Sequence, residues 1–151
     1  MLEVKNLSIH FTDRGMREEA VKQVNFSMKE GEILGIVGES GSGKTMTALT
    51  IAGLMKQSAR LESGEILLDG VDLLSLSAKE KRACQGNQIS MIFQEPMTAL
   101  NPTMKIGKQV EESLRLHTDL SKEERRQKAL QALEDVELEH PELLYHKYPH
   151  E

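Results

Sequence analysis

The sequence predicts an α/β fold, and three observations in its first third support this prediction. Ile33–Val37 is apolar on both faces, which is typical of a strand in the middle of a sheet that helices cover on both sides. A glycine-rich loop, Gly38–Thr45, follows directly, and we expect a helix over Thr45–Met55 that ends near Gly53. A strand, a turn and a helix in this order form the building unit of α/β proteins.

Length and composition indicate one globular domain. The chain has 151 residues, of which 38% are hydrophobic and 28% are charged, and this length can bury a substantial core. No apolar run approaches the length that spans a bilayer, and Met1–His10 lacks the pattern of a signal peptide, so we expect a cytosolic chain. Cys84 is the only cysteine, which excludes an internal disulfide. The net charge of −5 argues against a broad nucleic-acid-binding face.

The residues before the apolar strand predict a β-hairpin. Apolar residues at every second position predict a half-buried strand over Leu2–Phe11. The charged segment Thr12–Glu19 contains a glycine, so we expect an exposed hairpin loop there. A second strand is expected over Val21–Met28, and a turn then leads into the apolar strand.

The residues after the first helix predict short strands and then helices. Gly64–Gly70 predicts one strand, and Ile89–Phe93 predicts another that ends at Gln94. Serines three positions before a glutamate form capping boxes at Ser77 and Ser121, where we expect helices to begin. Helical spacing follows the second box at Ala129, Leu130, Leu133 and Val136. We therefore expect a β-rich core over residues 1–102 and a helical subdomain over residues 103–151.

The glycine-rich loop is the strongest functional signal. Gly38–Thr45 matches the phosphate-loop pattern G-x-x-x-x-G-K-[ST] in full, between an apolar strand and a helix. Its glycines permit positive φ and close approach, so that successive N–H groups can surround an anion. Lys44 can reach the β- and γ-phosphates, and the Thr45 hydroxyl can ligate Mg²⁺. The predicted nucleotide-binding residues here are Gly38, Glu39, Ser40, Gly41, Ser42, Gly43, Lys44, Thr45 and Met46.

The alternative interpretation is a glycine-rich turn with an incidental lysine. Chance matches to the pattern in a chain of this length are expected on the order of 0.01, which favours the phosphate loop. The loop by itself does not distinguish ATPases, GTPases and kinases.

Two further segments narrow the family. Gly35–Thr45 resembles the Walker A region of ABC ATPases, and Met91–Pro102 resembles the Q-loop of their oligopeptide, dipeptide and nickel importer branch. Tyr148–Glu151 is similar to the tetrapeptide that precedes the LSGG-type signature in that family. The resemblance covers the whole chain. It implies an ABC-type P-loop fold with a mixed β core, an antiparallel β subdomain and part of the helical subdomain.

The resemblance also implies roles for individual residues. ATP and Mg²⁺ are the implied cofactors. Gln94 matches the glutamine that contacts Mg²⁺ or the attacking water, which makes it the candidate catalytic residue and, with Thr45, a candidate metal ligand. Phe11 matches the position of an aromatic residue that stacks on adenine. A core-facing strand residue in register with Leu7 and Ile9 explains Phe11 equally well, so both interpretations stay open.

The implied partners are those of an importer subunit. The resemblance predicts a second ATP-binding subunit, in a homodimer or a heterodimer, and transmembrane permease subunits that place the chain at the cytoplasmic face of the membrane. An extracellular substrate-binding protein would act indirectly, and nucleic acid is not expected. The implied activity of the family is ATP hydrolysis coupled to uptake of peptides, or of nickel or metal chelates.

The sequence departs from the family in what it lacks. No LSGG-type signature, no Walker B strand ending in Asp-Glu and no switch histidine are present in the 151 residues. Positioning and charge stabilisation dominate phosphoryl transfer, so we expect this chain alone to bind nucleotide without turnover. Without the Walker B strand, we also expect Ile33–Val37 to have an open edge that favours association.

Other function classes have less support. A small-molecule kinase would need an acceptor site and a second charged cluster, which the sequence does not show, and the Q-loop string disfavours a DNA-repair or translation ATPase. His140, His146 and His150 lie close in sequence, but Pro149 interrupts a helix that would align the last two, so we favour a solvated segment over a metal site.

Overall fold

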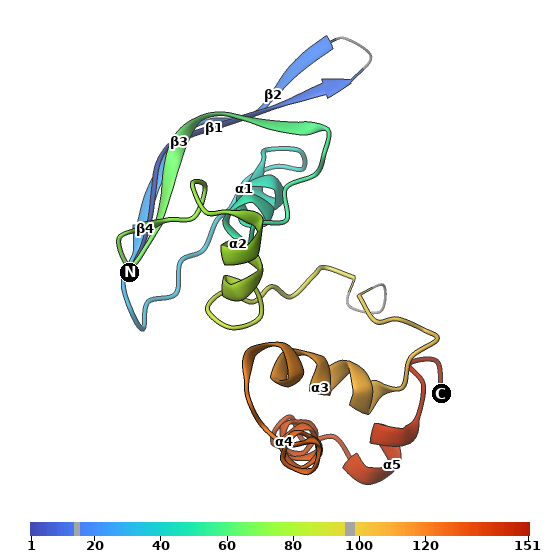
Figure 1. Cartoon of the computed structure of the whole chain (residues 1–151). Coiled ribbons are helices and arrows are strands. Elements are labelled where there is room, and N and C mark those ends of the chain that lie inside the picture. Colours follow the sequence, from blue (N-terminus) through green and yellow to red (C-terminus); the bar gives the residue numbers. More distant parts are fainter. Residues whose placement is uncertain (14–15, 96–98) are drawn as a thin grey trace. The chain divides into compact units, whose positions relative to one another are not determined.

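The computed structural model describes residues 1–13, 16–95 and 99–151 and divides the chain into two compact units, Met1–Gln85 and Gly86–Glu151. Figure 1 labels the helices and strands of each unit. The expected boundary between residues 102 and 103 differs in position from the division after Gln85 and stays a prediction. No helix in the described residues is long and apolar enough to cross a membrane.

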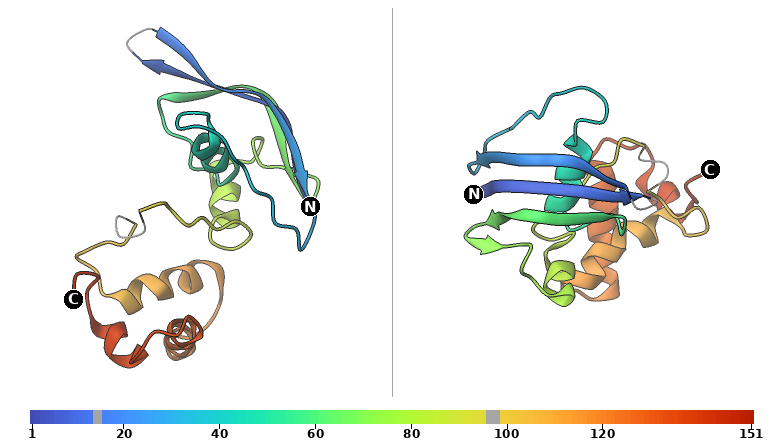
Figure 2. Two further views of the ribbon diagram at one scale, coloured as in Figure 1. Left: turned by 180° about the vertical axis from the view of Figure 1, so that it is seen from behind. Right: turned by 90° about the horizontal axis from the view of Figure 1, so that it is seen from above.

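The first unit contains a four-stranded antiparallel sheet with the strand order β2-β1-β3-β4. Its strands are β1 (Leu2–Asp13), β2 (Met16–Met28), β3 (Ala59–Leu68) and β4 (Val71–Asp72). Figure 2 shows β2, β1 and β3 side by side in its right-hand view. The expected strand over Val21–Met28 is confirmed as the second half of β2, and the strand expected within Gly64–Gly70 is the end of a longer β3.

The core of the sheet lies along β1. Val4, Leu7, Ile9 and Ile66 are at most 2% exposed, which confirms the predicted buried positions at Leu7 and Ile9. The pairing register shifts between Val4 and Leu7, at the point where Asn6 adopts a φ of 48°. This bulge explains why the buried positions are three residues apart here and two residues apart afterwards.

The predicted hairpin loop over Thr12–Glu19 is wrong. β1 and β2 stay paired through this segment, with Thr12 opposite Arg17 and Phe11 opposite Glu18, and residues 14–15 lie outside the described residues. Charged side chains are compatible with a strand pair whose faces both meet solvent. The charge of this segment therefore indicated exposure and not a loop.

Helix α1 (Lys44–Ile51) lies against one face of this sheet, as Figures 1 and 2 show. It buries Met46, Thr47 and Thr50, and it is shorter than the expected helix. Gly53 follows with a φ of +70°, the left-handed conformation that commonly ends a helix, so the predicted end is confirmed.

Helix α2 (Ala78–Cys84) completes the first unit. The Ser77 hydroxyl accepts the Glu80 N–H at 3.3 Å, and Glu80 accepts the Ser77 N–H at 2.8 Å. The predicted capping box is therefore confirmed.

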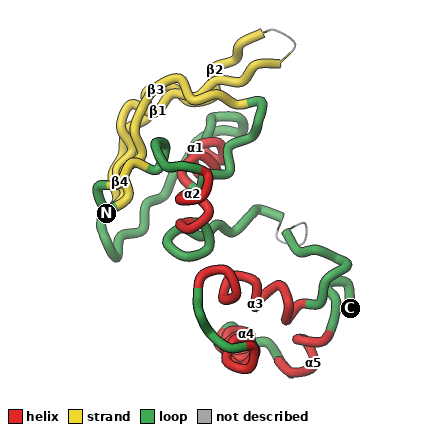
Figure 3. The backbone as a smooth tube through the Cα atoms, in the orientation of Figure 1, coloured by secondary structure: helices red, strands yellow, loops and turns green. Residues whose placement is uncertain are grey.

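Two predicted strands are not formed. The segment Ile33–Val37 has no strand structure and is drawn as loop in Figure 3. Ile33 and Val37 are 97% and 92% exposed. No strand among the described residues pairs with this segment, so its backbone lacks the ladder that would fix a strand. Ile89–Phe93 likewise forms only a single bridge at Ile89, and Ile92 is exposed.

The second unit is helical. It consists of α3 (Ile106–His117), α4 (Lys122–Asp135) and α5 (Pro141–His146). The capping box at Ser121 is confirmed at the start of α4. Its core cluster comprises Ala129, Leu133 and Tyr145, with Ile106, Val110 and Leu130 packed against it. The spacing prediction is therefore correct for Ala129, Leu130 and Leu133, whereas Val136 follows the helix and is exposed.

A buried polar group ties α3 to α5. The Tyr145 hydroxyl donates to the carboxylate of Glu111, which is 6% exposed, and Lys108 donates to the same carboxylate at 3.1 Å. Burial raises the pKa of Glu111, but the hydrogen bonds from Tyr145 and Lys108 outweigh it and lower this pKa overall. Burial, with the bond to Glu111, raises the pKa of Tyr145. The ring of Tyr145 also leaves no room for a side chain at Gly107.

Candidate functional site

The glycine-rich loop leads from the extended segment 32–37 into α1. Within it, the Ser42 N–H donates to the Glu39 carbonyl at 3.2 Å and closes a turn. Gly41 and Gly43 have φ values of +82° and +85°, in the left-handed region that favours glycine. The two glycines therefore fulfil the conformational role that the sequence pattern assigned to them.

Gly43 fixes the loop against the sheet. A Cβ atom at this position would overlap the carbonyl oxygen of Ala20 and would lie 3.0 Å from Val21 Cγ2, both on β2. Around Gly41, by contrast, a Cβ atom would meet nothing within 4 Å. The close approach explains why the position directly before the lysine holds a glycine on steric grounds as well as for its backbone conformation.

The start of α1 presents backbone donors. Gly43 is its N-cap residue and makes no side-chain cap, while its carbonyl accepts the Thr47 N–H at 2.9 Å and the Thr47 hydroxyl at 3.0 Å. The first N–H groups of a helix have no partner within the helix, and its dipole places partial positive charge at this end. This geometry suits an anion.

The Lys44 ammonium lies over the loop that precedes it. Its Nζ donates to the carbonyl oxygens of Gly38 at 2.7 Å and Glu39 at 2.6 Å, and to the Ser42 hydroxyl at 3.2 Å. The loop thus holds the positive charge of the lysine beside its own backbone N–H groups, which strengthens the attraction for an anion.

A cavity of about 230 Å³ opens beside the loop. The residues lining it come from β1, β2, the loop, α1 and the segment after α1, all within the first unit. They are Phe11, Ala20, Gly41, Ser42, Gly43, Lys44, Thr45, Met46, Leu49 and Lys56. The structure therefore brings Phe11 together with the phosphate loop, although Phe11 lies 27 positions before Gly38 in the sequence.

Some of the sequence-predicted residues lie outside this cavity lining. Gly38 and Glu39 contact Lys44 through their carbonyls, and Ser40 is exposed in the turn. Met46 lines the cavity and is 8% exposed, so most of its side chain lies in the core. Gln94 is exposed and belongs to the second unit.

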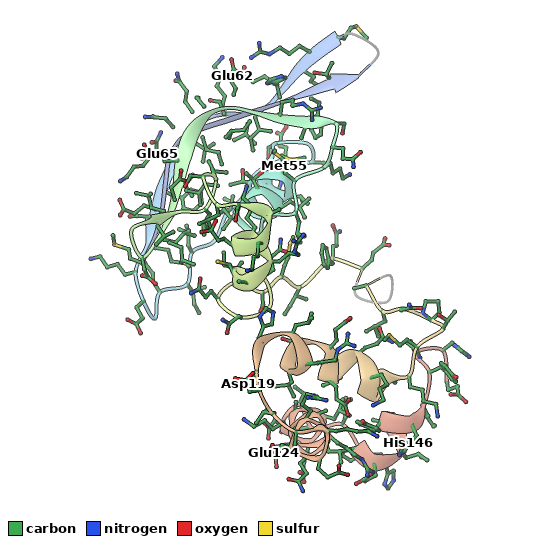
Figure 4. All side chains as sticks on the ribbon, viewed as in Figure 1. Met55, Glu62, Glu65, Asp119, Glu124 and His146 are labelled. Atoms are coloured by element: carbon green, nitrogen blue, oxygen red, sulfur yellow. The ribbon has the colours of Figure 1, made fainter. Side chains whose placement is uncertain are left out.

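Sequence reasoning missed Ala20, Leu49 and Lys56. Leu49 lies one helical turn after Thr45 and Met46, so helical periodicity could have identified it. Ala20 lines the cavity because Gly43 packs against β2 at this residue, and no local sequence motif indicates that contact. Lys56 directly follows Met55, which Figure 4 labels, in a segment without a recognisable pattern.

Residues 1–13, 16–95 and 99–151 hold no group of three or more His, Cys, Asp or Glu side chains placed to bind a metal ion. Ser42 and Thr45 both bring hydroxyl oxygens to the cavity lining, and Thr45 is an exposed residue in the first turn of α1.

The family model described as ABC transporter matches residues 21–150, which is most of the chain. The chain belongs to the ABC transporter family. The predicted resemblance to the ABC transporter family is thereby confirmed. This ABC chain is 47% identical to the oligopeptide transport ATP-binding protein OppD of Bacillus subtilis and 40% identical to the dipeptide transport ATP-binding protein DppD of Escherichia coli.

Both alignments cover 100% of the ABC chain but only 42% and 46% of these relatives. The chain therefore spans less than half of the length of the curated relatives it matches.

Solved structures confirm the fold of the ABC chain. A dimeric ATP-binding cassette, captured in a post-hydrolysis state bound to ADP and Pi, superposes with a TM-score of 0.85 and 30% identity. The match covers 99% of the ABC chain and 62% of that cassette. The expected α/β fold of ABC type is thus confirmed, although Ile33–Val37 and Ile89–Phe93 do not form strands here.

Proposed function

We propose that the ABC chain is the nucleotide-binding part of an importer ATPase subunit and that it takes ATP in the cavity beside Gly38–Thr45. The observation that carries this proposal is the shared cavity, in which Phe11 and the phosphate loop line one space of about 230 Å³. A nucleotide has an aromatic base at one end and an anionic tail at the other, and this cavity offers an aromatic ring and an anion-binding loop.

The phosphates would lie against the start of α1. The N–H groups that follow Gly43 supply hydrogen-bond donors, and the Lys44 ammonium supplies positive charge. On phosphate binding, Lys44 would exchange its bonds to the Gly38 and Glu39 carbonyls for phosphate oxygens. Phe11 would stack on the adenine, which agrees with its half-buried position on the cavity wall.

Mg²⁺ fits the residues that this loop provides. Magnesium prefers oxygen ligands and keeps several waters, so the Thr45 hydroxyl, the nucleotide phosphates and water would hold it. The ion would neutralise phosphate charge during hydrolysis. Gln94 would be a second metal contact and the catalytic residue, orienting the attacking water; its family position supports this role.

The relatives support a transport role. Their names describe ATP-binding proteins for oligopeptide and dipeptide transport, and so favour peptides over nickel or metal chelates as the imported substrate. ATP binding and hydrolysis would drive uptake through permease subunits and a second ATP-binding subunit at the cytoplasmic face of the membrane. The division after residue 102 would separate the catalytic core from the helical part that meets the permeases.

A second candidate function is nucleotide binding without turnover. It is favoured by the absence of an LSGG-type signature, a Walker B Asp-Glu pair and a switch histidine from the 151 residues. Steady-state phosphate release with MgATP separates the two functions. For this chain alone we expect a rate equal to that of its Lys44→Ala variant, and release well above that rate would favour the enzyme.

Nucleotide binding itself is tested by calorimetric titration of the 151-residue chain with MgATP. Binding should be lost in Lys44→Ala and retained in Lys79→Ala, which removes an exposed lysine of α2 outside the cavity. Equal affinities of wild type and Lys44→Ala would contradict the proposed site, and so would a wild-type chain that is folded by circular dichroism but does not bind.

A further inference from the structure

The segment after α1 contributes a second cation to the proposed nucleotide cavity. Lys56 lines the cavity together with Lys44 and Phe11, but it lies outside the phosphate loop and outside every motif in the sequence. Two lysines and no carboxylate are among the ten lining residues, although the chain as a whole carries a net charge of −5. The cavity is therefore positively charged within an acidic chain and suits a ligand with several negative charges.

Backbone contacts hold the Lys56 segment beside Phe11. The Ala59 N–H donates to the Lys56 carbonyl at 3.0 Å and closes a tight turn. The Thr12 N–H donates to the Ser58 carbonyl at 3.2 Å, and Phe11 and Ala59 are paired residues of β1 and β3. Ala59 is 1% exposed, so the end of this turn is anchored in the core.

A side-chain clamp holds the same turn. The Arg60 guanidinium donates to the Gln57 carbonyl and, at 3.0 Å, to the Ala59 carbonyl. The turn thus has a defined conformation that does not depend on the Lys56 side chain. Within residues 1–13, 16–95 and 99–151, the Lys56 ammonium makes no hydrogen bond or ion pair, and the residue is exposed. Its charge has no structural role in the described residues.

We propose that Lys56 is a nucleotide-binding residue whose ammonium contacts the phosphate nearest the ribose. The inference rests on the proposed function, because it assumes that the nucleotide occupies this cavity. Lys44 would contact the phosphates from the phosphate loop, which leads into α1. Lys56 would contact them from the side of Phe11, where the base and ribose would lie. Two cations on separate elements would hold the tail from two directions, as a compact ammonium on a flexible stem can do.

Binding of ATP and ADP to Lys56→Met tests this assignment, because methionine keeps the apolar stem and removes the charge. We expect the dissociation constants for both nucleotides to rise by about three- to tenfold, the range for one partly exposed charge-assisted contact. The factor should be equal for ATP and ADP, since both carry the phosphate nearest the ribose. It should shrink in about 1 M salt, where the screening length falls to about 3 Å.

Two further variants serve as controls. Lys79→Met removes the same charge from an exposed position of the same unit and should bind like wild type. Lys56→Arg keeps the charge and should retain most of the affinity.

The inference on Lys56 is overturned, with the proposed function intact, if Lys56→Met and Lys79→Met bind equally while Lys44→Met loses binding. A loss confined to ATP would overturn the assignment to the phosphate nearest the ribose. If the folded wild-type chain binds neither nucleotide, the proposed function fails, and the inference fails with it.

Discussion

Replacing Gly43 by alanine separates two reasons for a glycine at this position. Gly43 has a φ of +85°, and a Cβ atom there would overlap the Ala20 carbonyl oxygen of β2. Gly41 has nearly the same backbone conformation, with a φ of +82°, but a Cβ atom there would meet nothing within 4 Å. Gly41→Ala is therefore a matched control that carries the conformational penalty without the steric one.

The expected magnitudes follow from these two environments. An alanine in the left-handed conformation costs roughly 1–2 kcal/mol, and both variants should show this loss. Gly43→Ala also forces the loop away from a backbone carbonyl that cannot rotate aside, and such overpacking costs typically about 1–3 kcal/mol. We therefore expect Gly43→Ala to be less stable than Gly41→Ala by about 1–3 kcal/mol.

The same displacement should weaken nucleotide binding. The N–H groups that follow Gly43 would move away from the position that the phosphates occupy. A loss of about 1.4 kcal/mol corresponds to a tenfold change in the dissociation constant, and we expect at least that difference between the two variants. Urea unfolding measures the stability, and calorimetric titration with MgATP measures the affinity.

Equal effects of the two substitutions would refute this reasoning. Such a result would mean that the loop is not held against β2 at Ala20, and that the glycine is needed for its φ alone. A Gly43→Ala variant with lower stability but unchanged affinity would instead show that the contact supports the fold and not the phosphate site.

Three further predictions concern stability and association. Tyr145→Phe removes the hydroxyl that donates to the buried Glu111 carboxylate and should destabilise the chain by about 1–3 kcal/mol in urea unfolding; an unchanged midpoint would exclude this bond as a stabilising contact. Folding lowers the pKa of Glu111 from 4.5, so the ionised Glu111 carboxylate stabilises the folded chain fully above pH 4.5. This stabilisation is lost as the pH falls through the lower pKa of the folded state, and the loss of stability in acid should therefore be smaller in Glu111→Gln. Replacing Ile33 and Val37, which are 97% and 92% exposed, by threonine should reduce self-association in sedimentation velocity, and an unchanged sedimentation profile would show that another surface drives association.

Local signals in the sequence were sufficient to predict local structure. The capping boxes at Ser77 and Ser121 form as expected because both partners of each box lie within three residues of one another. The glycines of the phosphate loop adopt positive φ because the turn itself requires it. Gly53 ends α1 because it adopts the left-handed conformation, which glycine accepts without steric cost. In each case the interaction that stabilises the conformation is contained in the motif.

Predictions that depend on distant partners failed or stayed open. Ile33–Val37 has the composition of a central strand, but a strand also needs neighbours that supply its hydrogen bonds, and the described residues place none beside it. The predicted loop over Thr12–Glu19 failed for the opposite reason, because pairing between β1 and β2 continues through charged residues. Hydrophobic pattern reports where a side chain can lie, whereas strand pairing is decided by what lies next to it.

The candidate site combines both kinds of information. The sequence pattern alone predicted the loop Gly38–Thr45, but the cavity beside it depends on contacts between distant residues of the first unit. Phe11 reaches the cavity because β1 pairs with β3, and Lys56 reaches it because the turn before β3 is tied to β1 at Thr12. The sheet that carries Phe11 is therefore also what positions Lys56. Loosening the Lys56–Ala59 turn should consequently weaken the contacts of both Phe11 and Lys56 with the same nucleotide. A substitution within Gly38–Thr45 should instead leave the pairing of β1 with β3 intact.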